Sequence, residues 1–131
     1  MNYLGLDDVV MIAASVLRVK PEVLLRTSRI NSAESAVHAP GASFGGTEFH
    51  PGFKRKIGVL GYRLVRNHPF PDGNKRVAFL AMVEMAERND ASWNEPADDP
   101  DGIESAEMML AAAAGDIDEA TFVAWVKTRV S

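Results

Sequence analysis

Apolar residues recur along most of the chain at the three- and four-residue spacing of helices with one buried face. The first such segment begins at Leu6 and has its apolar positions at Val9, Ile12, Ala13, Val16 and Leu17. Acidic residues in its first turn suit the helix dipole, and Asp7 or Asp8 is placed to cap the helix. Pro21 ends this segment and predicts the start of a short second helix.

The segment from Ile30 to Gly52 departs from this pattern. It is rich in Ser, Ala, Gly and Pro, and its portion GASFGGTEFHPG has no helical period. We therefore predict a long loop, or flap, with short extended pieces around Phe44 and around Glu48 and Phe49. Loops of this length are uncommon in compact domains and are often functional. Plain connecting chain is an equally good interpretation from composition alone.

Helical periodicity returns in two segments on either side of a polar stretch. The first runs from Phe53 to Arg66, and its basic residues, which predict a cationic surface, are Lys54, Arg55, Lys56, Arg63 and Arg66. The second runs from Lys75 to Arg88 and is apolar nearly all round, as expected of a central helix buried on several sides. The pair Asn89-Asp90 is placed to end it.

The remainder of the chain predicts an acidic surface loop and two further helices. The loop is Asn94 to Asp101, and the helices are Ile103 to Ala114 and Asp118 to Arg129. Methionine and aromatic residues at helical spacing are typical of a core rather than of cofactor contacts. The whole pattern predicts an all-α bundle of about five to seven helices with one long loop.

Composition narrows the setting of this bundle. The chain has 131 residues, which suits a single domain spanning residues 1–131. Its net charge of −4 argues against nucleic acid as the main partner, because such domains usually carry a basic face. The absence of cysteine excludes structural disulfides and thiolate metal sites and favours a reducing cytosol. Neither a signal peptide nor an apolar run of ~18 residues is found, so we expect a cytoplasmic protein that does not enter the membrane.

One stretch, NHPFPDGNKRVAF, carries most of the candidate chemistry. Pro69 and Pro71 stiffen the backbone on both sides of Phe70, which is placed to anchor a loop that holds His68 outward. A histidine side chain changes charge near neutral pH, so it can accept a proton from an attacking hydroxyl group. This segment therefore offers a candidate general base.

The same stretch ends at the start of a predicted helix, where free N–H groups and the helix dipole favour anions. Lys75 and Arg76 add positive charge there, and arginine can grip phosphate oxygens bidentately. Gly73 permits backbone geometry that other residues resist. Asp72 suits a Mg²⁺ that bridges diphosphate oxygens, because a carboxylate repels the phosphate itself.

These groups together indicate a phosphoryl- or nucleotidyl-transfer site. The alternative is a polar turn in which Asp72 or Asn74 merely caps a helix. The set of residues at this spacing carries more information than any one of them. No Walker loop is present, which argues against a P-loop nucleotidase.

From His68 to Arg76 the chain resembles the signature of the Fic/Doc family, HPFx[D/N]GNxR, at every fixed position. The segment SFGGTEFHP resembles the flap of that family, and AAAAGDID followed by a terminal helix resembles the Doc branch. The resemblance covers most of the chain from about Ile30 onward and is weak before it. It implies the all-α Fic fold, a compact helical bundle with a long flap loop before the central helix pair.

The resemblance also implies roles for individual residues. His68 corresponds to the general base toward a target hydroxyl group, and Asp72 to the ligand of Mg²⁺. The residues assigned to the anion hole that binds ATP are Gly73, Asn74, Lys75 and Arg76. The residues assigned to the flap that aligns the target are Phe44, Gly45 and Gly46.

Two departures from the family pattern point to one branch of it. Family members that transfer AMP usually read GNGRxxR, whereas this chain has Lys75 at the second glycine and Phe79 where the distal arginine falls. In both respects it resembles Doc toxins, which transfer the γ-phosphate of ATP to a threonine of elongation factor Tu and so stall translation. The alternatives are an AMP or other nucleotidyl transferase acting on a protein hydroxyl and a catalytically idle Fic-fold binding partner.

The chain lacks the segment by which some family members inhibit themselves. Self-inhibited family members carry an [S/T]xxxE[G/N] helix, but no Glu of this chain has Ser or Thr four residues before it. The resemblance therefore implies inhibition in trans by a Phd-like antitoxin, whose disordered tail folds into a groove of the toxin. The cationic segment from Phe53 to Arg66 is placed to attract an acidic tail, although a solvated face is the commoner use of such charges.

Overall fold

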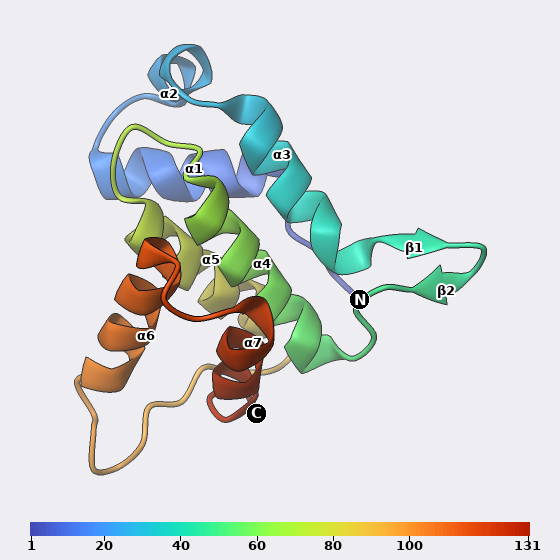
Figure 1. The fold of residues 1–131 in the computed structure, drawn as a ribbon. Helices are drawn as coiled ribbons and strands as arrows, with labels where there is room; N and C mark the ends of the chain where they lie inside the picture. The colour runs from blue at the N-terminus through green and yellow to red at the C-terminus, as the bar shows by residue number, and fades with distance from the viewer.

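Seven α-helices and one short β-hairpin make up the computed structural model, which describes all residues from Met1 to Ser131 (Figure 1). The helices are α1 (Leu6–Leu17), α2 (Pro21–Thr27), α3 (Ile30–His38), α4 (Phe53–Asn67), α5 (Asn74–Arg88), α6 (Ile103–Ala114) and α7 (Glu119–Lys127). The hairpin is formed by β1 (Ser43–Phe44) and β2 (Thr47–Glu48). The predicted all-α fold is confirmed, as is the short second helix that begins at Pro21.

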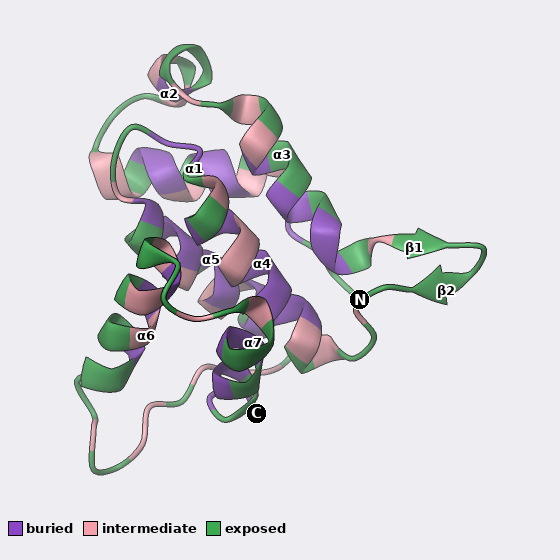
Figure 2. Cartoon of the chain, viewed as in Figure 1, coloured by how far each residue is buried: buried purple, intermediate pink, exposed green.

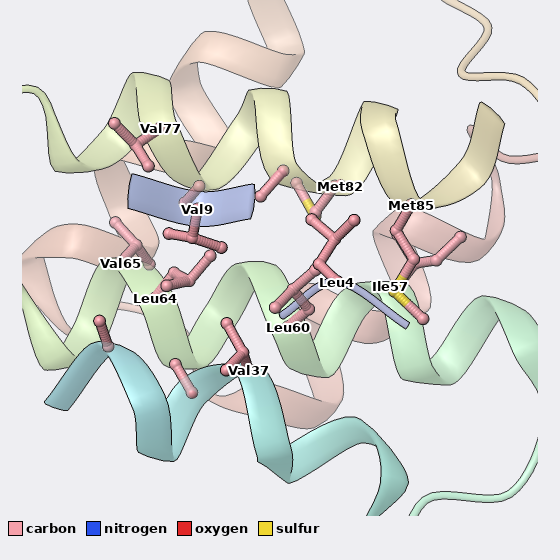
Figure 3. Packing of buried hydrophobic residues seen from close by; sticks show 14 of the residues in the cluster. Leu4, Val9, Val37, Ile57, Leu60, Leu64, Val65, Val77, Met82 and Met85 are labelled. Atoms are coloured by element: carbon pink, nitrogen blue, oxygen red, sulfur yellow. The ribbon is translucent and has the colours of Figure 1, made fainter. Parts of the chain in front are cut away.

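The two 15-residue helices α4 and α5 form the centre of the bundle. Helix α4 packs against α3, α5, α6 and α7, while α1 covers α5 on another side. Figure 3 shows Val77, Met82 and Met85 of α5 facing the row of apolar side chains on α4 that includes Leu60 and Leu64. All five side chains are fully buried. Burial is concentrated where α1, α4 and α5 meet, and the hairpin lies outside this core (Figure 2).

The predicted loop from Ile30 to Gly52 was wrong over its first part. Helix α3 occupies Ile30–His38, and a 3₁₀ turn, η1, follows at Ala39–Gly41. Ala33, Ala36 and Val37 are buried at helical spacing, but small residues between serines give only a weak hydrophobic pattern. The loop is thus shorter than expected, and the extended pieces predicted in its second part are confirmed as β1 and β2.

The start of α1 also differs from the prediction, because Gly5 is its N-cap rather than Asp7 or Asp8. The Asp8 carboxylate lies three residues into the helix and accepts a hydrogen bond of 2.8 Å from the Gly5 N–H. It also accepts one of 2.8 Å from the Arg88 guanidinium, which joins the start of α1 to the end of α5. These two donors, Arg88 first, lower the pKa of Asp8 below its usual value.

The structure keeps only part of the cationic surface that the sequence predicts for α4. Lys56 is buried, and its Nζ lies 3.0 Å from a carboxylate oxygen of Glu48 and donates to a carbonyl of η1. Arg63 pairs with Glu119 of α7 at 2.8 Å. Arg66 donates to carbonyl oxygens at the end of α6. These three cations therefore hold neighbouring elements together, while Lys54 and Arg66 remain exposed.

The last third of the chain follows the predicted order. Residues 94–101 form a loop, and α6 has the bounds that the sequence predicts. The α7 helix is capped by Asp118, whose carboxylate accepts a hydrogen bond of 2.8 Å from the Thr121 N–H. Short antiparallel pairing of Trp93 with Val130 ties the chain after α5 to the segment after α7. All of the helices fall short of the length and apolar character needed to cross a membrane.

Candidate active site

The segment between α4 and α5 is closed by its own side chains. Phe70 is 2% exposed and anchors the loop in the core, as predicted. The buried side-chain amide of Asn74 accepts a hydrogen bond of 3.0 Å from the Phe70 N–H and donates one of 2.9 Å to the Phe70 carbonyl. The side chain of Asn74 is therefore occupied within the loop, and only its backbone N–H remains for a ligand.

His68 ends α4 in a left-handed conformation with a φ of 48°, and it is exposed. Its carbonyl oxygen accepts a hydrogen bond of 2.5 Å from the guanidinium of Arg29, which also donates to the Asn67 carbonyl at 2.9 Å. The Arg29 N–H donates to the Pro69 carbonyl at 2.8 Å. Arg29 thus holds the turn that presents His68. Sequence reasoning missed it, because a lone arginine 39 residues away carries no motif.

Helix α5 begins at a glycine that no other residue replaces without strain. Gly73 is its N-cap, with a φ of 72°, and neither Asp72 nor Asn74 caps the helix through its side chain. A Cβ at Gly73 would lie 3.1 Å from Val16 and 3.2 Å from Leu17, because α1 packs directly behind this turn. Both the positive φ and the close approach therefore favour glycine here.

The first turn of α5 presents unpaired donors. The first helical hydrogen bond runs from Val77 N–H to the Gly73 carbonyl at 2.9 Å. The backbone N–H groups of Asn74, Lys75 and Arg76 consequently have no carbonyl partner in the helix. The Lys75 and Arg76 side chains are exposed and form no ion pair, unlike the engaged cations of α4. Donors and charge together make this turn attractive to an anion.

These groups share one cavity of about 230 Å³, which we call the motif cavity. Its lining residues are Val65, His68, Asp72, Gly73, Asn74, Lys75, Arg76 and Ala113. The structure thus brings together every residue for which sequence reasoning predicted a base, metal or phosphate role. Ala113 of α6 was not expected, and it is placed there by the hydrogen bonds between Arg66 and the end of α6. The arrangement can bind an anion beside an imidazole that is able to take up a proton.

Comparison with family profiles identifies a family for this chain. A profile described as Fic/DOC family matches residues 3–86, well over half of the 131 residues. This chain belongs to the Fic/DOC family. Membership indicates a transferase that acts on proteins. A search of curated proteins finds no match of significance.

The extent of the Fic/DOC match differs from the resemblance seen in the sequence. It begins at residue 3 and so includes α1 and α2, where we expected only weak likeness. It stops within the last turn of α5, so that α6 and α7 lie beyond it. In this Fic/DOC protein the match therefore contains the whole motif, whereas one wall of the motif cavity comes from α6.

The predicted flap is formed but does not line the motif cavity. Gly45 and Gly46 have φ values of 58° and 83°, as a tight two-residue hairpin turn requires, and Phe44 is 81% exposed. The ion pair between Glu48 and Lys56 holds the hairpin beside the first turn of α4. His68 lies twelve residues further along, roughly 18 Å at the rise of an α-helix. The target-docking role of the hairpin stays a prediction.

Proposed function

We propose that this protein is a Doc-type kinase toxin that transfers the γ-phosphate of ATP to a hydroxyl group of another protein. The observation that carries the proposal is the motif cavity, which joins His68, Asp72 and the unpaired donors at the start of α5. A phenylalanine occupies position 79, where AMP-transferring relatives usually have the arginine that contacts the far phosphates. That departure favours phosphate transfer over AMP transfer.

The chemistry follows from the positions of the side chains. The N–H groups of the first turn of α5, with Lys75 and Arg76, would hold the γ-phosphate oxygens and their developing charge. The hydroxyl oxygen of the target attacks the γ-phosphorus, and the bond from that phosphorus to the bridging oxygen of the β-phosphate breaks, so ADP leaves. His68 takes the proton of the hydroxyl group. Arg29 acts only by holding the turn behind His68.

Asp72 fits a Mg²⁺ that arrives with the nucleotide. One of its oxygens accepts the Gly73 N–H at 2.8 Å, which leaves the other available in the motif cavity. The structure contains no cluster of three or more metal-binding side chains. A single carboxylate beside phosphate oxygens and water is nevertheless a usual way for proteins to hold Mg²⁺. When bound, the ion neutralises phosphate charge.

The target and the regulation follow from the Doc resemblance. We propose a threonine of elongation factor Tu as the acceptor, so that the modification blocks translation. We further propose a Phd-like antitoxin as the inhibitor, because no Glu of this chain has the spacing of the family's self-inhibitory segment. Three cations of α4, Lys54, Arg55 and Arg66, have no carboxylate partner and would attract an acidic tail, whereas Lys56 and Arg63 are paired with carboxylates.

The test is to incubate the purified protein with elongation factor Tu and with ATP labelled on either the α- or the γ-phosphate. The proposal expects label on the target only from γ-labelled ATP, and none with His68→Ala. Label from the α position alone would refute phosphate transfer and favour an AMP transferase. Growth inhibition that persists in His68→Ala cells would refute catalysis as its cause and favour an idle binding partner.

A further inference from the structure

A second, larger cavity lies directly beside the motif cavity and shares two residues with it. Its volume is about 460 Å³, and Lys75 and Arg76 line both cavities. One wall is the first two turns of α5, and the other is the acidic loop with the start of α6. The lining residues are Lys75, Arg76, Phe79, Glu95, Pro100, Asp101, Gly102, Ser105, Ala106 and Met109. We call it the loop cavity. Its volume is that of a small-molecule site.

The loop cavity has an apolar part whose aromatic ring is held in place. Phe79 is half-buried, and Met109 from the opposite wall is 4% exposed. The ring of Phe79 meets the ring of Trp93 edge-on, with 5.1 Å between centroids, and Trp93 meets Trp125 at 5.2 Å. This chain of aromatic contacts connects Phe79 to the core. A fixed aromatic ring beside a methionine suits a flat, apolar group.

Two carboxylates give the loop cavity its polarity. Glu95 is held by Ser105, whose hydroxyl donates to both carboxylate oxygens at 2.8 and 2.9 Å, and by the indole N–H of Trp93. Asp101 is exposed and takes part in no hydrogen bond or ion pair of its side chain. A polyphosphate is attracted by Lys75 and Arg76 but repelled by these carboxylates. A ligand that fills both cavities therefore has an anionic end and an uncharged end with hydrogen-bond donors.

We propose that the loop cavity holds the nucleoside of the nucleotide whose terminal phosphate lies in the motif cavity. The base would lie against Phe79 and Met109, and Asp101 would accept a hydrogen bond from a ribose hydroxyl or a base amino group. This inference rests on the proposed function in so far as the ligand is a nucleoside triphosphate. It assigns a role to the loop Asn94 to Asp101, whose sequence predicts only an acidic surface.

The test compares the binding of ATP with that of inorganic tripolyphosphate, each with Mg²⁺, by isothermal titration calorimetry. We expect the wild-type protein to bind ATP more tightly than tripolyphosphate. Phe79→Ala should weaken ATP binding about tenfold, a typical loss when an aromatic ring that stacks on a base is removed, and should change tripolyphosphate binding less than twofold. Met11→Ala, an exposed apolar residue of α1 that lines neither cavity, is the matched control and should change neither.

Two further variants keep the test sharp if Phe79→Ala folds poorly. Ala106 is exposed and lines the loop cavity, so Ala106→Leu fills the cavity without disturbing the core and should also weaken only ATP binding. Asp101→Asn removes a negative charge and should tighten tripolyphosphate binding without tightening ATP binding.

Equal affinity of the wild-type protein for ATP and tripolyphosphate would overturn the inference, as would ATP affinity unchanged by Ala106→Leu. These measurements do not depend on catalysis. Loss of the proposed kinase activity with the ATP preference intact would refute the proposed function alone. Conversely, if γ-phosphate transfer is observed but ATP affinity is unchanged in Phe79→Ala and Ala106→Leu, only the nucleoside site is refuted.

Discussion

The contrast between two neighbouring residues, Asn74 and Lys75, offers a direct test of how the site is built. Asn74→Ala removes two hydrogen bonds to Phe70, of 3.0 and 2.9 Å, and leaves a buried N–H and a buried carbonyl without partners. Each such group costs roughly 1–3 kcal/mol, while alanine returns about 0.5 kcal/mol of helix propensity. For the two groups together, less the gain in helix propensity, we therefore expect the free energy of unfolding to fall by about 1.5–5.5 kcal/mol.

Urea denaturation followed by far-UV circular dichroism measures this change as a shift of the midpoint at an unchanged slope. Lys75→Ala is the matched control, because Lys75 is the next residue, is exposed and has no ion pair. It should alter stability by less than about 0.5 kcal/mol and yet weaken phosphate transfer. Equal stability of the two variants would refute the role of the Asn74 side chain in holding the loop at Phe70. A large loss of stability in Lys75→Ala would refute the assignment of Lys75 to ligand binding.

Three more predictions concern other parts of the fold. His68→Gly should abolish transfer but raise the free energy of unfolding by about 0.5–1 kcal/mol, because the left-handed φ of 48° suits glycine; a less stable variant in thermal melts would contradict this. The lowered pKa of Asp8 stabilises the fold above about pH 4 and less as pH falls through the folded-state value. Asp8→Asn should therefore cost at most about 1 kcal/mol at pH 7, since Arg88 is well exposed. The variant should also lose less stability than the wild-type protein as the pH falls below about 4. Parallel curves of stability against pH for the two proteins would count against the ion pair. Gly61→Ala should cost about 1–3 kcal/mol, because its Cβ would lie 2.3 Å from the Met82 sulfur, and an unchanged midpoint would mean that Met82 repacks freely.

The helices and the motif could be predicted because their signals are local. Each long helix has a strong apolar period, and Pro21 marks a helix start through its own covalent geometry. The motif residues lie within nine positions of each other, so a single turn into α5 brings them to one cavity. The anchoring of Phe70 followed from the same local reasoning, since two prolines fix the backbone around it.

What the sequence did not reveal depends on distant partners. Lys56 has the pattern of a surface cation, and its burial arises from η1 and Glu48, which approach only in the folded chain. Arg29 is tied to the turn of His68 across 39 residues. The first half of the expected flap is helical because α4 covers its alanines. Small residues give too weak a hydrophobic pattern for this buried face to be predicted from the sequence. Asn74 matches the motif, but its side chain serves the loop rather than the ligand.

The position of the hairpin sets a minimum length for a substrate segment that contacts both the hairpin and His68, at opposite ends of α4. Its base is pinned at Lys56, and His68 ends the same helix roughly 18 Å away. An extended strand advances about 3.3 Å per residue, so a chain laid on the hairpin edge needs about six more residues to bring a hydroxyl group to His68. The segment that is gripped and the residue that is modified are then separate parts of the substrate. For a substrate that docks on the hairpin, short peptides centred on the acceptor residue are expected to be poor substitutes for the whole protein.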